Sequence, residues 1–147
     1  MTKNRRALIF SVIFTIIVVG VLLTSYYEKQ SRRAVDYASF VDALQADGMS
    51  VKSAGKLPVD FFSVEGQALI IKDQFLVVVF EYPDAASAEA DASKVSPDGR
   101  SVGTIKPSFG FTPHFYKSGR LIAVYVGDDK GATKILESVL GPQFAGG

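Results

Sequence analysis

The 147-residue sequence contains no cysteine, no tryptophan and a single histidine. Without cysteine the chain can form no disulfide, no thiolate metal site and no lipid-modified cysteine anchor, and it has no thiol nucleophile. With one histidine, any zinc site or nucleophile–histidine pair would have to be built around His114. We therefore expect no cofactor, no metal site and no enzymatic activity.

A large excess of charge of one sign is also missing, because the formal net charge is only +1. This value is the sum of two unlike regions. Residues 1–33 carry six basic side chains and one acid, whereas residues 34–147 carry ten basic and fourteen acidic side chains. Because the longer region is acidic, we do not expect it to bind nucleic acid.

The segment from Ala7 to Tyr27 has 21 residues and no charged side chain. As a helix it would extend about 31 Å, which matches a bilayer core of about 30 Å. Tyr26 and Tyr27 stand at its end, where aromatic rings favour the membrane interface. We predict a transmembrane signal-anchor helix over 7–27 that contacts the lipid bilayer and follows a short basic tail, residues 1–6. A cleaved signal peptide is the alternative, but its apolar region is usually only ~7–15 residues and ends in an Ala-x-Ala-like site that is absent here.

The charges beside this segment do not fix its orientation. Three basic side chains precede it and three follow it, namely Lys3, Arg5 and Arg6, then Lys29, Arg32 and Arg33. A first apolar segment with a basic start typically acts as an export signal. We therefore expect the N-terminus inside the cell and the globular part outside the cytoplasmic membrane.

Residues 34–147 are enough for one domain with its own core, joined to the span by a polar linker, residues 28–33. Apolar spacing predicts helices near 35–47, 84–95 and 130–140, and strands near 49–54, 57–61, 68–71, 75–82, 105–111 and 121–126. Turns are expected at 72–74, 96–99 and 117–119, and a frayed tail at 144–147.

A weak internal repeat accompanies this pattern. Leu76–Pro97 aligns without gaps on Leu121–Pro142, and the alignment places Asp84 on Asp129, each at the expected start of a helix. We predict an α+β fold of two layers, in which a leading helix is followed by two β-β-α units. Their strands would form a mainly antiparallel sheet with the helices packed on one face.

Few residues are candidates for chemistry. His114 could transfer protons with an acidic partner, or could be an ordinary strand histidine that bonds a backbone carbonyl. Asp128 and Asp129 could bind a cation, but their charge also suits a helix N-terminus.

An aromatic segment close to basic residues is the best candidate for an interaction or ligand surface. Its members are Phe109, Phe111, His114, Phe115, Tyr116 and Arg120. Because Phe109 and Phe111 alternate with polar residues, their pattern favours the core face of a strand over an exposed surface.

Several short motifs stand in one order along the domain. They are YPDAA at 82–86, SPDG at 96–99, PHFY at 113–116, YVGDD at 125–129 and LGPQFA at 140–145. In this the chain resembles, over about residues 40–145, a family of small bacterial envelope proteins, often of lipoprotein type, that has no established function. The resemblance implies a bacterial, extracytoplasmic setting and transfers no catalytic or binding residue. The missing cysteine departs from the lipoprotein form and leaves the helix as the anchor.

Together these features predict a single-pass, membrane-anchored extracytoplasmic domain that acts as an accessory or protein-interaction module of the cell envelope. Its expected partner is another membrane or envelope protein. The alternative is a small-ligand-binding or sensor domain that uses the aromatic strand around His114.

Overall fold

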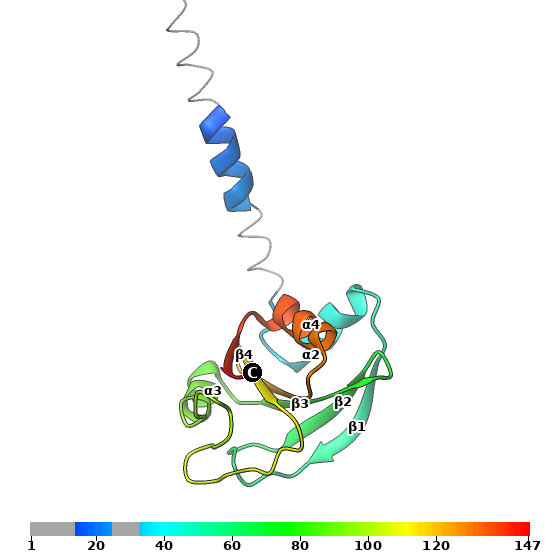
Figure 1. Ribbon diagram of the computed structural model, residues 1–147. Helices are drawn as coiled ribbons and strands as arrows, with labels where there is room; N and C mark the ends of the chain where they lie inside the picture. The colour runs from blue at the N-terminus through cyan, green and yellow to red at the C-terminus, as the bar shows by residue number, and fades with distance from the viewer. Residues whose placement is uncertain (1–13, 25–32) are drawn as a thin grey trace, which may run out of the picture. The chain divides into compact units, whose positions relative to one another are not determined.

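A computed structural model describes residues 14–24 and 33–147 of the chain, which divides into two units, Met1–Arg32 and Arg33–Gly147. In the first unit, residues 14–24 form a helix (Figure 1). All of these residues are exposed. Among the described residues, no helix combines the length and the apolar character needed to cross a membrane. The predicted span 7–27 lies partly outside the described residues, as does the linker 28–33, and the basic tail 1–6 lies wholly outside them.

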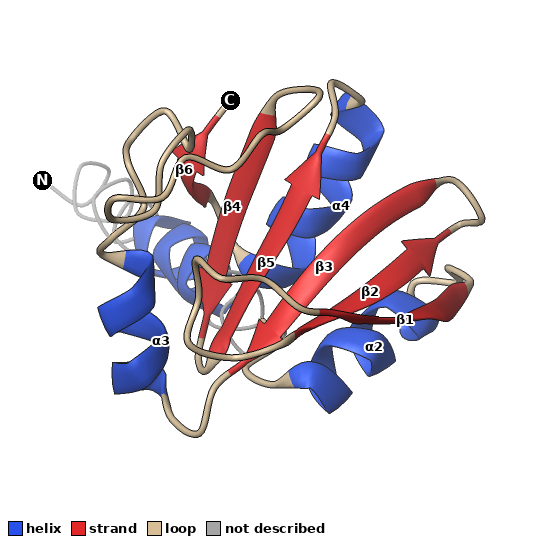
Figure 2. Cartoon of the chain, turned by 90° about the horizontal axis from the view of Figure 1, so that it is seen from below, coloured by secondary structure: helices blue, strands red, loops and turns tan. Residues whose placement is uncertain are grey.

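The second unit is an antiparallel sheet with three helices (Figure 2). Its elements in chain order are α2 (Tyr37–Ala46), β1 (Val51–Leu57), β2 (Gly66–Ile71), β3 (Phe75–Glu81), α3 (Ala85–Ala92), β4 (Pro113–Ser118), β5 (Leu121–Val126), α4 (Lys130–Leu140) and β6 (Gln143–Gly146). The strand order is β1-β2-β3-β5-β4-β6, and every neighbouring pair is antiparallel. The α+β class and the antiparallel sheet are thus confirmed.

The sheet is apolar on both faces, and each face has its own core. In β3, Val77 and Val79 belong to the core that contains α2 and α4, whereas Phe80 belongs to the core that contains α3. We call these the α2/α4 face and the α3 face. The first is filled by residues of β2, β3 and β5 together with Phe40, Leu44, Leu136, Val139 and Leu140 of the two helices. The second is filled by Phe62, Phe80, Tyr82, Ala88, Ala92, Phe115, Ile122 and Val124.

The prediction that the helices share one face is therefore wrong for α3. The two β-β-α units are present, as β2-β3-α3 and β4-β5-α4. However, positions 45 residues apart point to opposite sides of the sheet, since Val79 lies on the α2/α4 face and its counterpart Val124 lies on the α3 face. Helix α3 contacts β5 on one face and α4 contacts β4 on the other, so the domain has three layers instead of the predicted two.

Two predicted strands are not formed. Residues 58–65 and 103–112 run outside the sheet, and only isolated bridges involve Val102, with Val95 and Ile105. Pro58 and Pro107 have no N–H to donate to a ladder, which disfavours a strand in either segment. The strand that leads into the hairpin is β4, which begins at Pro113, after the predicted segment has ended.

The predicted frayed tail is also wrong, because its residues form β6. This strand pairs with β4 through His114 and Gly146, Phe115 and Ala145, and Tyr116 and Gln143. Ala145 is buried in the α3 face. Local sequence gives little sign of this strand, because its pairing partner lies about 30 residues earlier in the chain.

Candidate functional site

His114 lies on the second residue of β4 and is 9% exposed. It stands opposite Tyr125 of β5, and the two rings stack with their centroids 5.8 Å apart and their planes at 24°. The aromatic face of Tyr125 is the electron-rich side of the ring, which favours a positive charge above it. The histidine is thus held in the sheet, as the strand interpretation predicted.

Both ring nitrogens of His114 have partners within the chain. Nδ1 lies 2.8 Å from Oε1 of Gln143 in β6, and Nε2 lies 3.0 Å from the carbonyl oxygen of Gly127, which follows β5. The imidazole therefore connects three segments, and neither nitrogen is left free for an external acid or ligand. This geometry does not favour His114 as the wall of a ligand pocket.

The other residues of the predicted aromatic surface do not gather on one surface. Phe115 and Tyr116 are fully buried on opposite faces of the sheet. Phe109 is half-buried against the α3 face, while Phe111 is 66% exposed on the preceding loop. Arg120 lies at the other end of the β4–β5 hairpin from His114.

Much of the aromatic segment is core instead. Phe109 and Phe62 approach Phe115 with ring centroids 6.2 and 6.4 Å away, in edge-to-face geometry. Phe144 of β6 covers the same ring at 6.1 Å. Such edge contacts stabilise a core beyond the area that they bury. The core interpretation therefore fits Phe109 and is wrong for Phe111, which is exposed.

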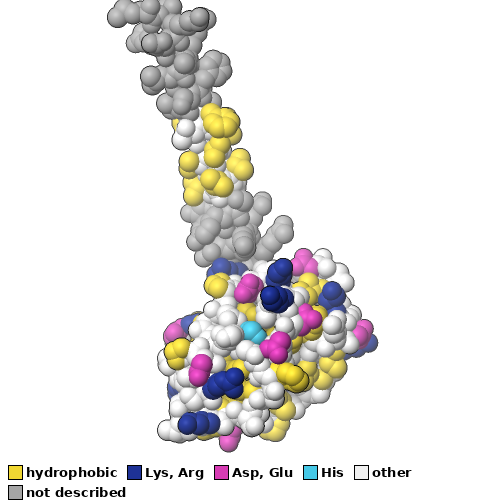
Figure 3. Space-filling view, in the orientation of Figure 1, with side chains coloured by type: hydrophobic (Ala, Val, Ile, Leu, Met, Phe, Trp, Pro, Cys, Tyr) yellow, Lys and Arg dark blue, Asp and Glu magenta, His cyan; other side chains and the backbone are white. Residues whose placement is uncertain are grey.

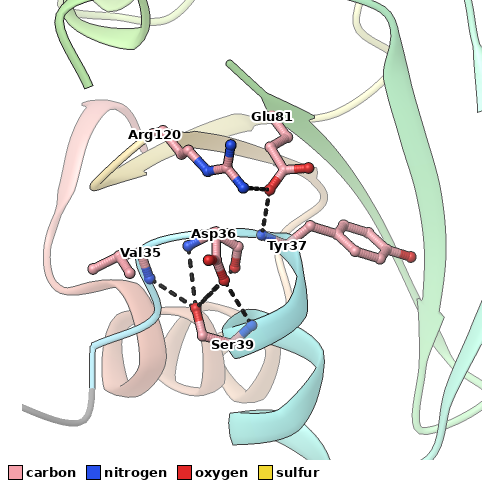
Figure 4. A network of polar contacts seen from close by, with 6 residues as sticks. All are labelled: Val35, Asp36, Tyr37, Ser39, Glu81 and Arg120. Atoms are coloured by element: carbon pink, nitrogen blue, oxygen red, sulfur yellow. Dashed lines mark hydrogen bonds and ion pairs between the residues drawn. The ribbon is translucent and has the colours of Figure 1, made fainter. Parts of the chain in front are cut away.

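A polar network fixes the first residues of the domain (Figure 4). Asp36 caps α2, since its Oδ1 accepts from the backbone N–H of Ser39 at 2.9 Å, and the Ser39 hydroxyl accepts from the N–H groups of Val35 and Asp36. This reciprocal capping box satisfies N–H groups that a helix start leaves unpaired. The hydroxyl and N–H of Ser39 hold the pKa of Asp36 below its ordinary value.

Glu81 connects this helix start to the sheet. Its Oε1 accepts from the N–H of Tyr37 at 3.1 Å and pairs with Nη2 of Arg120 at 2.9 Å. The N–H of Arg120 also donates to the carbonyl of Val35 at 3.0 Å. We call Val35, Asp36, Tyr37, Ser39, Glu81 and Arg120 the entry network, because it ties the start of the domain to the ends of β3 and β5. Arg120 thus has a structural partner that sequence reasoning did not find.

The entry network also explains a glycine. Gly119 has φ +55, and a Cβ on it would lie 2.5 Å from the carbonyl oxygen of Val35. A side chain at this position would push the start of the domain away from the β4–β5 turn. The predicted turn at 117–119 therefore has a packing role in addition to closing the hairpin.

Sequence reasoning missed Asp91, the most deeply buried charged side chain among the described residues, at 2% exposed. Its Oδ2 accepts from the N–H and hydroxyl of Ser63, at 2.7 and 2.8 Å, and from the hydroxyl of Tyr82 at 3.0 Å. Its Oδ1 pairs with Nζ of Lys94 at 2.7 Å. The available signal was the position of an acid on the same helix face as Ala88 and next to Ala92, both of which are buried.

The donors around Asp91 fix its charge. Burial alone would raise the pKa of this carboxyl, but the hydrogen bonds from Lys94, Ser63 and Tyr82 outweigh that effect and lower the pKa to about 2. Burial raises the pKa of the Tyr82 hydroxyl, and the adjacent Asp91 carboxylate raises it further. Asp91 is thus a permanently charged group that holds the 58–65 loop on α3.

The two predicted helix-cap aspartates are confirmed. Asp84 accepts from the N–H of Ser87 at 2.7 Å, and Asp129 accepts from the N–H groups of Gly131 and Ala132 at 2.7 and 3.1 Å. Over residues 14–24 and 33–147, no three His, Cys, Asp or Glu side chains gather as metal ligands would. Acidic and basic side chains are interspersed on the visible face of the domain (Figure 3).

Comparison with known proteins adds no relative, because no protein family, curated protein or solved structure matches the chain. The resemblance to bacterial envelope proteins therefore stays a prediction.

Proposed function

We propose that the protein is a single-pass, membrane-anchored accessory module whose domain lies outside the cytoplasmic membrane and contacts another membrane or envelope protein, without catalysing a reaction. One observation carries the anchoring. The run from Ala7 to Tyr27 has no charge, and its described part, residues 14–24, is a helix with exposed apolar side chains (Figure 3). Phe14, Ile16 and Val21 are 71, 65 and 62% exposed. So many exposed apolar groups on one helix are characteristic of a surface that meets lipid or protein.

The entry network supports the same proposal from the side of the domain. It binds residues 35–39 to the ends of β3 and β5 through Glu81 and Arg120. The first residues of a domain are poorly ordered unless contacts hold them, and the entry network supplies several such contacts. Two observations support the accessory role. One is the resemblance to envelope proteins, and the other is that the polar atoms of His114 and Asp91 are bonded within the chain and not directed at a substrate.

The anchoring is tested by two paired charge substitutions. Ile17→Asp with Val21→Asp places two carboxylates in the helix, at a cost of roughly 2.5–3.5 kcal/mol each if the segment crosses the bilayer. We expect the wild-type chain to stay in the membrane fraction after alkaline washing and the double variant to leave it. Leu76→Asp is the matched control, because Leu76 is a comparably exposed apolar residue of the domain, at 54%, and it should leave the distribution unchanged.

Orientation and partner need separate measurements. A reporter enzyme fused after Gly147 should be active only in its export-dependent form. Activity of a cytoplasm-dependent reporter would reverse the proposed topology. Cross-linking followed by purification in several mild detergents, from cells that contain the native partners, should retain one defined envelope protein. Recovery of the chain alone from each detergent would contradict the accessory role.

A further inference from the structure

Independently of the anchoring, the hydrogen bonds of His114 define its protonation state. The Gly127 carbonyl can only accept, so Nε2 must carry a proton to make the 3.0 Å contact. The amide of Gln143 is oriented by its own donation, because Nε2 of Gln143 donates to the carbonyl of Gly146 at 3.0 Å. Oε1 of Gln143 therefore faces His114 as an acceptor, and Nδ1 must carry a proton as well. Only the imidazolium cation satisfies both contacts.

Loss of one proton leaves this arrangement with a conflict. If Nδ1 is deprotonated, its lone pair faces Oε1 of Gln143 at 2.8 Å, and the amide must rotate to present its NH₂ group. That rotation breaks the bond to Gly146 and places the amide oxygen against the Gly146 carbonyl. If Nε2 is deprotonated, its lone pair faces the Gly127 carbonyl. Either route removes a tie between His114 and a neighbouring segment.

The segment most affected is β6. It has four residues, it lies at the edge of the sheet, and its register with β4 is interrupted between Phe115 and Tyr116. Beyond the ladder, the N–H groups of Gly146 and Gly147 donate to the carbonyls of Pro97 and Pro113, Ala145 is buried in the α3 face, and the ring of Phe144 contacts Phe115. A four-residue edge strand has a low local stability, so the loss of the Gln143–His114 bond shifts its opening equilibrium.

We propose that His114 is a proton-dependent switch, which as a cation fixes β6 on β4 and as a neutral ring releases β6 and uncovers the edge of β4. Histidine is the side chain whose charge changes most readily between pH 5 and 8. A released β6 would leave unpaired N–H and C=O groups on β4, where another strand can add. The switch thus supplies a conditional interaction edge, which the proposed accessory function does not require.

Other titratable groups surround the ring and enter the same equilibrium. Tyr125 stacks on it from β5, and Tyr116 follows it on the same face of β4, where burial and then Glu137 of α4 raise the pKa of the Tyr116 hydroxyl. Asp128 and Asp129 follow the Gly127 carbonyl directly. Removal of the imidazole alone, with these groups kept, therefore separates its contribution from theirs.

The chain suits a direct test, because it has one histidine and no tryptophan. In the full-length protein in detergent micelles, nitrogen NMR of His114 should show protons on both ring nitrogens at pH 5.5 and one proton at pH 8.5. Over the same interval, hydrogen-exchange protection of the Gly146 amide, corrected for intrinsic exchange, should fall roughly tenfold or more, the effect expected for one charge-assisted hydrogen bond. The amide of Val78 in central β3 is the internal reference and should not change.

Two variants separate the switch from a general effect of pH. His114→Phe keeps a ring on Tyr125 without a titratable group, and it should make protection of Gly146 independent of pH. Phe144→Trp places a fluorophore on β6, whose emission should report the same transition in the wild-type background and lose it with His114→Phe. A neutral imidazole at pH 5.5 with β6 fully protected would overturn the proposal. So would an unchanged pH dependence in His114→Phe, and the NMR measurement decides the question even if that variant does not fold.

Discussion

The two β-β-α units each bury one acidic or basic side chain, and they hold it in opposite ways. In β2-β3-α3 the residue is Asp91, which is surrounded by donors from Ser63, Tyr82 and Lys94. In β4-β5-α4 it is His114, which is surrounded by the acceptors of Gln143 and Gly127. Each set of neighbours selects the charged form of its residue.

The difference lies in the pH at which that charge can change. The pKa of Asp91 is lowered to about 2, so its carboxylate is charged at any physiological pH. A histidine changes charge near neutrality. The contacts also differ in what they connect, because Asp91 fixes a loop to a helix, whereas His114 fixes an edge strand. The contacts of Asp91 in β2-β3-α3 are therefore permanent, whereas those of His114 in β4-β5-α4 depend on the charge of its ring.

The largest expected effect is that of Asp91→Asn. The substitution keeps the shape of the side chain, but it removes the charge and replaces one acceptor oxygen with an NH₂ group, which must face either Lys94 or the donors of Ser63 and Tyr82. We expect the free energy of unfolding to fall by about 3 kcal/mol, because a buried site with several donors loses the charge and one of the acceptors that they bind. Thermal unfolding of the full-length protein in detergent, followed by circular dichroism at pH 7, measures this loss.

Asp128→Asn is the matched control for that measurement. Asp128 is exposed, and it precedes the α4 cap without capping the helix itself. Its substitution should change the unfolding free energy by less than about 0.5 kcal/mol. If the two substitutions lowered the unfolding free energy equally, the contacts of the Asp91 carboxylate would not be what stabilises the fold.

The next largest effect is the pH dependence of the free energy of unfolding that the Asp91 carboxylate causes. Because its pKa is lower in the folded chain than the ordinary 3.8, the carboxylate stabilises the fold fully above about pH 4, and this contribution is lost as the pH falls toward about 2. A shift of this size corresponds to about 2 kcal/mol. The difference in unfolding free energy between wild type and Asp91→Asn should therefore narrow by about that amount between pH 5 and 2.

Other carboxyls whose pKa is also lowered by hydrogen bonds, such as Asp36 and Asp84, titrate in both proteins and cancel in the difference. A difference that stays constant between pH 5 and 2 would show that the buried carboxylate is not the group that titrates.

Local features of both units could be predicted from the sequence. Asp84 and Asp129 were expected at helix starts because a capping carboxylate acts on N–H groups two or three residues away, and both cap their helices. The apolar runs of β3 and β5 were expected as central strands, and they are. These features depend on neighbours in the chain, which a sequence displays directly.

The sites could not be predicted because their partners are distant in the chain. His114 meets Gln143 across 29 residues, and Asp91 meets Ser63 across 28. The residues of β6 carry no apolar pattern of their own, and their place became visible only through pairing with β4. Likewise, the alternation of Phe109 and Phe111 resembles a strand, but the segment is a loop in which Phe109 packs against the α3 face and Phe111 is exposed. Two aromatic residues in period two therefore establish neither a strand nor a shared buried face.

The smallest expected losses of stability come from substituting the two N-cap aspartates. These residues occupy equivalent positions in the two β-β-α units, so their substitution compares the units directly. Asp129 accepts from two backbone N–H groups and Asp84 from one. Each lost cap leaves N–H groups at a helix start without an acceptor. Asp129→Ala should therefore lower the thermal unfolding midpoint more than Asp84→Ala. Each of the two should lower it by less than Asp91→Asn. Asp84→Ser and Asp129→Ser restore an acceptor and should recover most of each loss. If Asp84→Ala had the larger effect, the single bond to Ser87 would be the stronger cap, and the stability of the first unit would depend on its helix start as well as on Asp91.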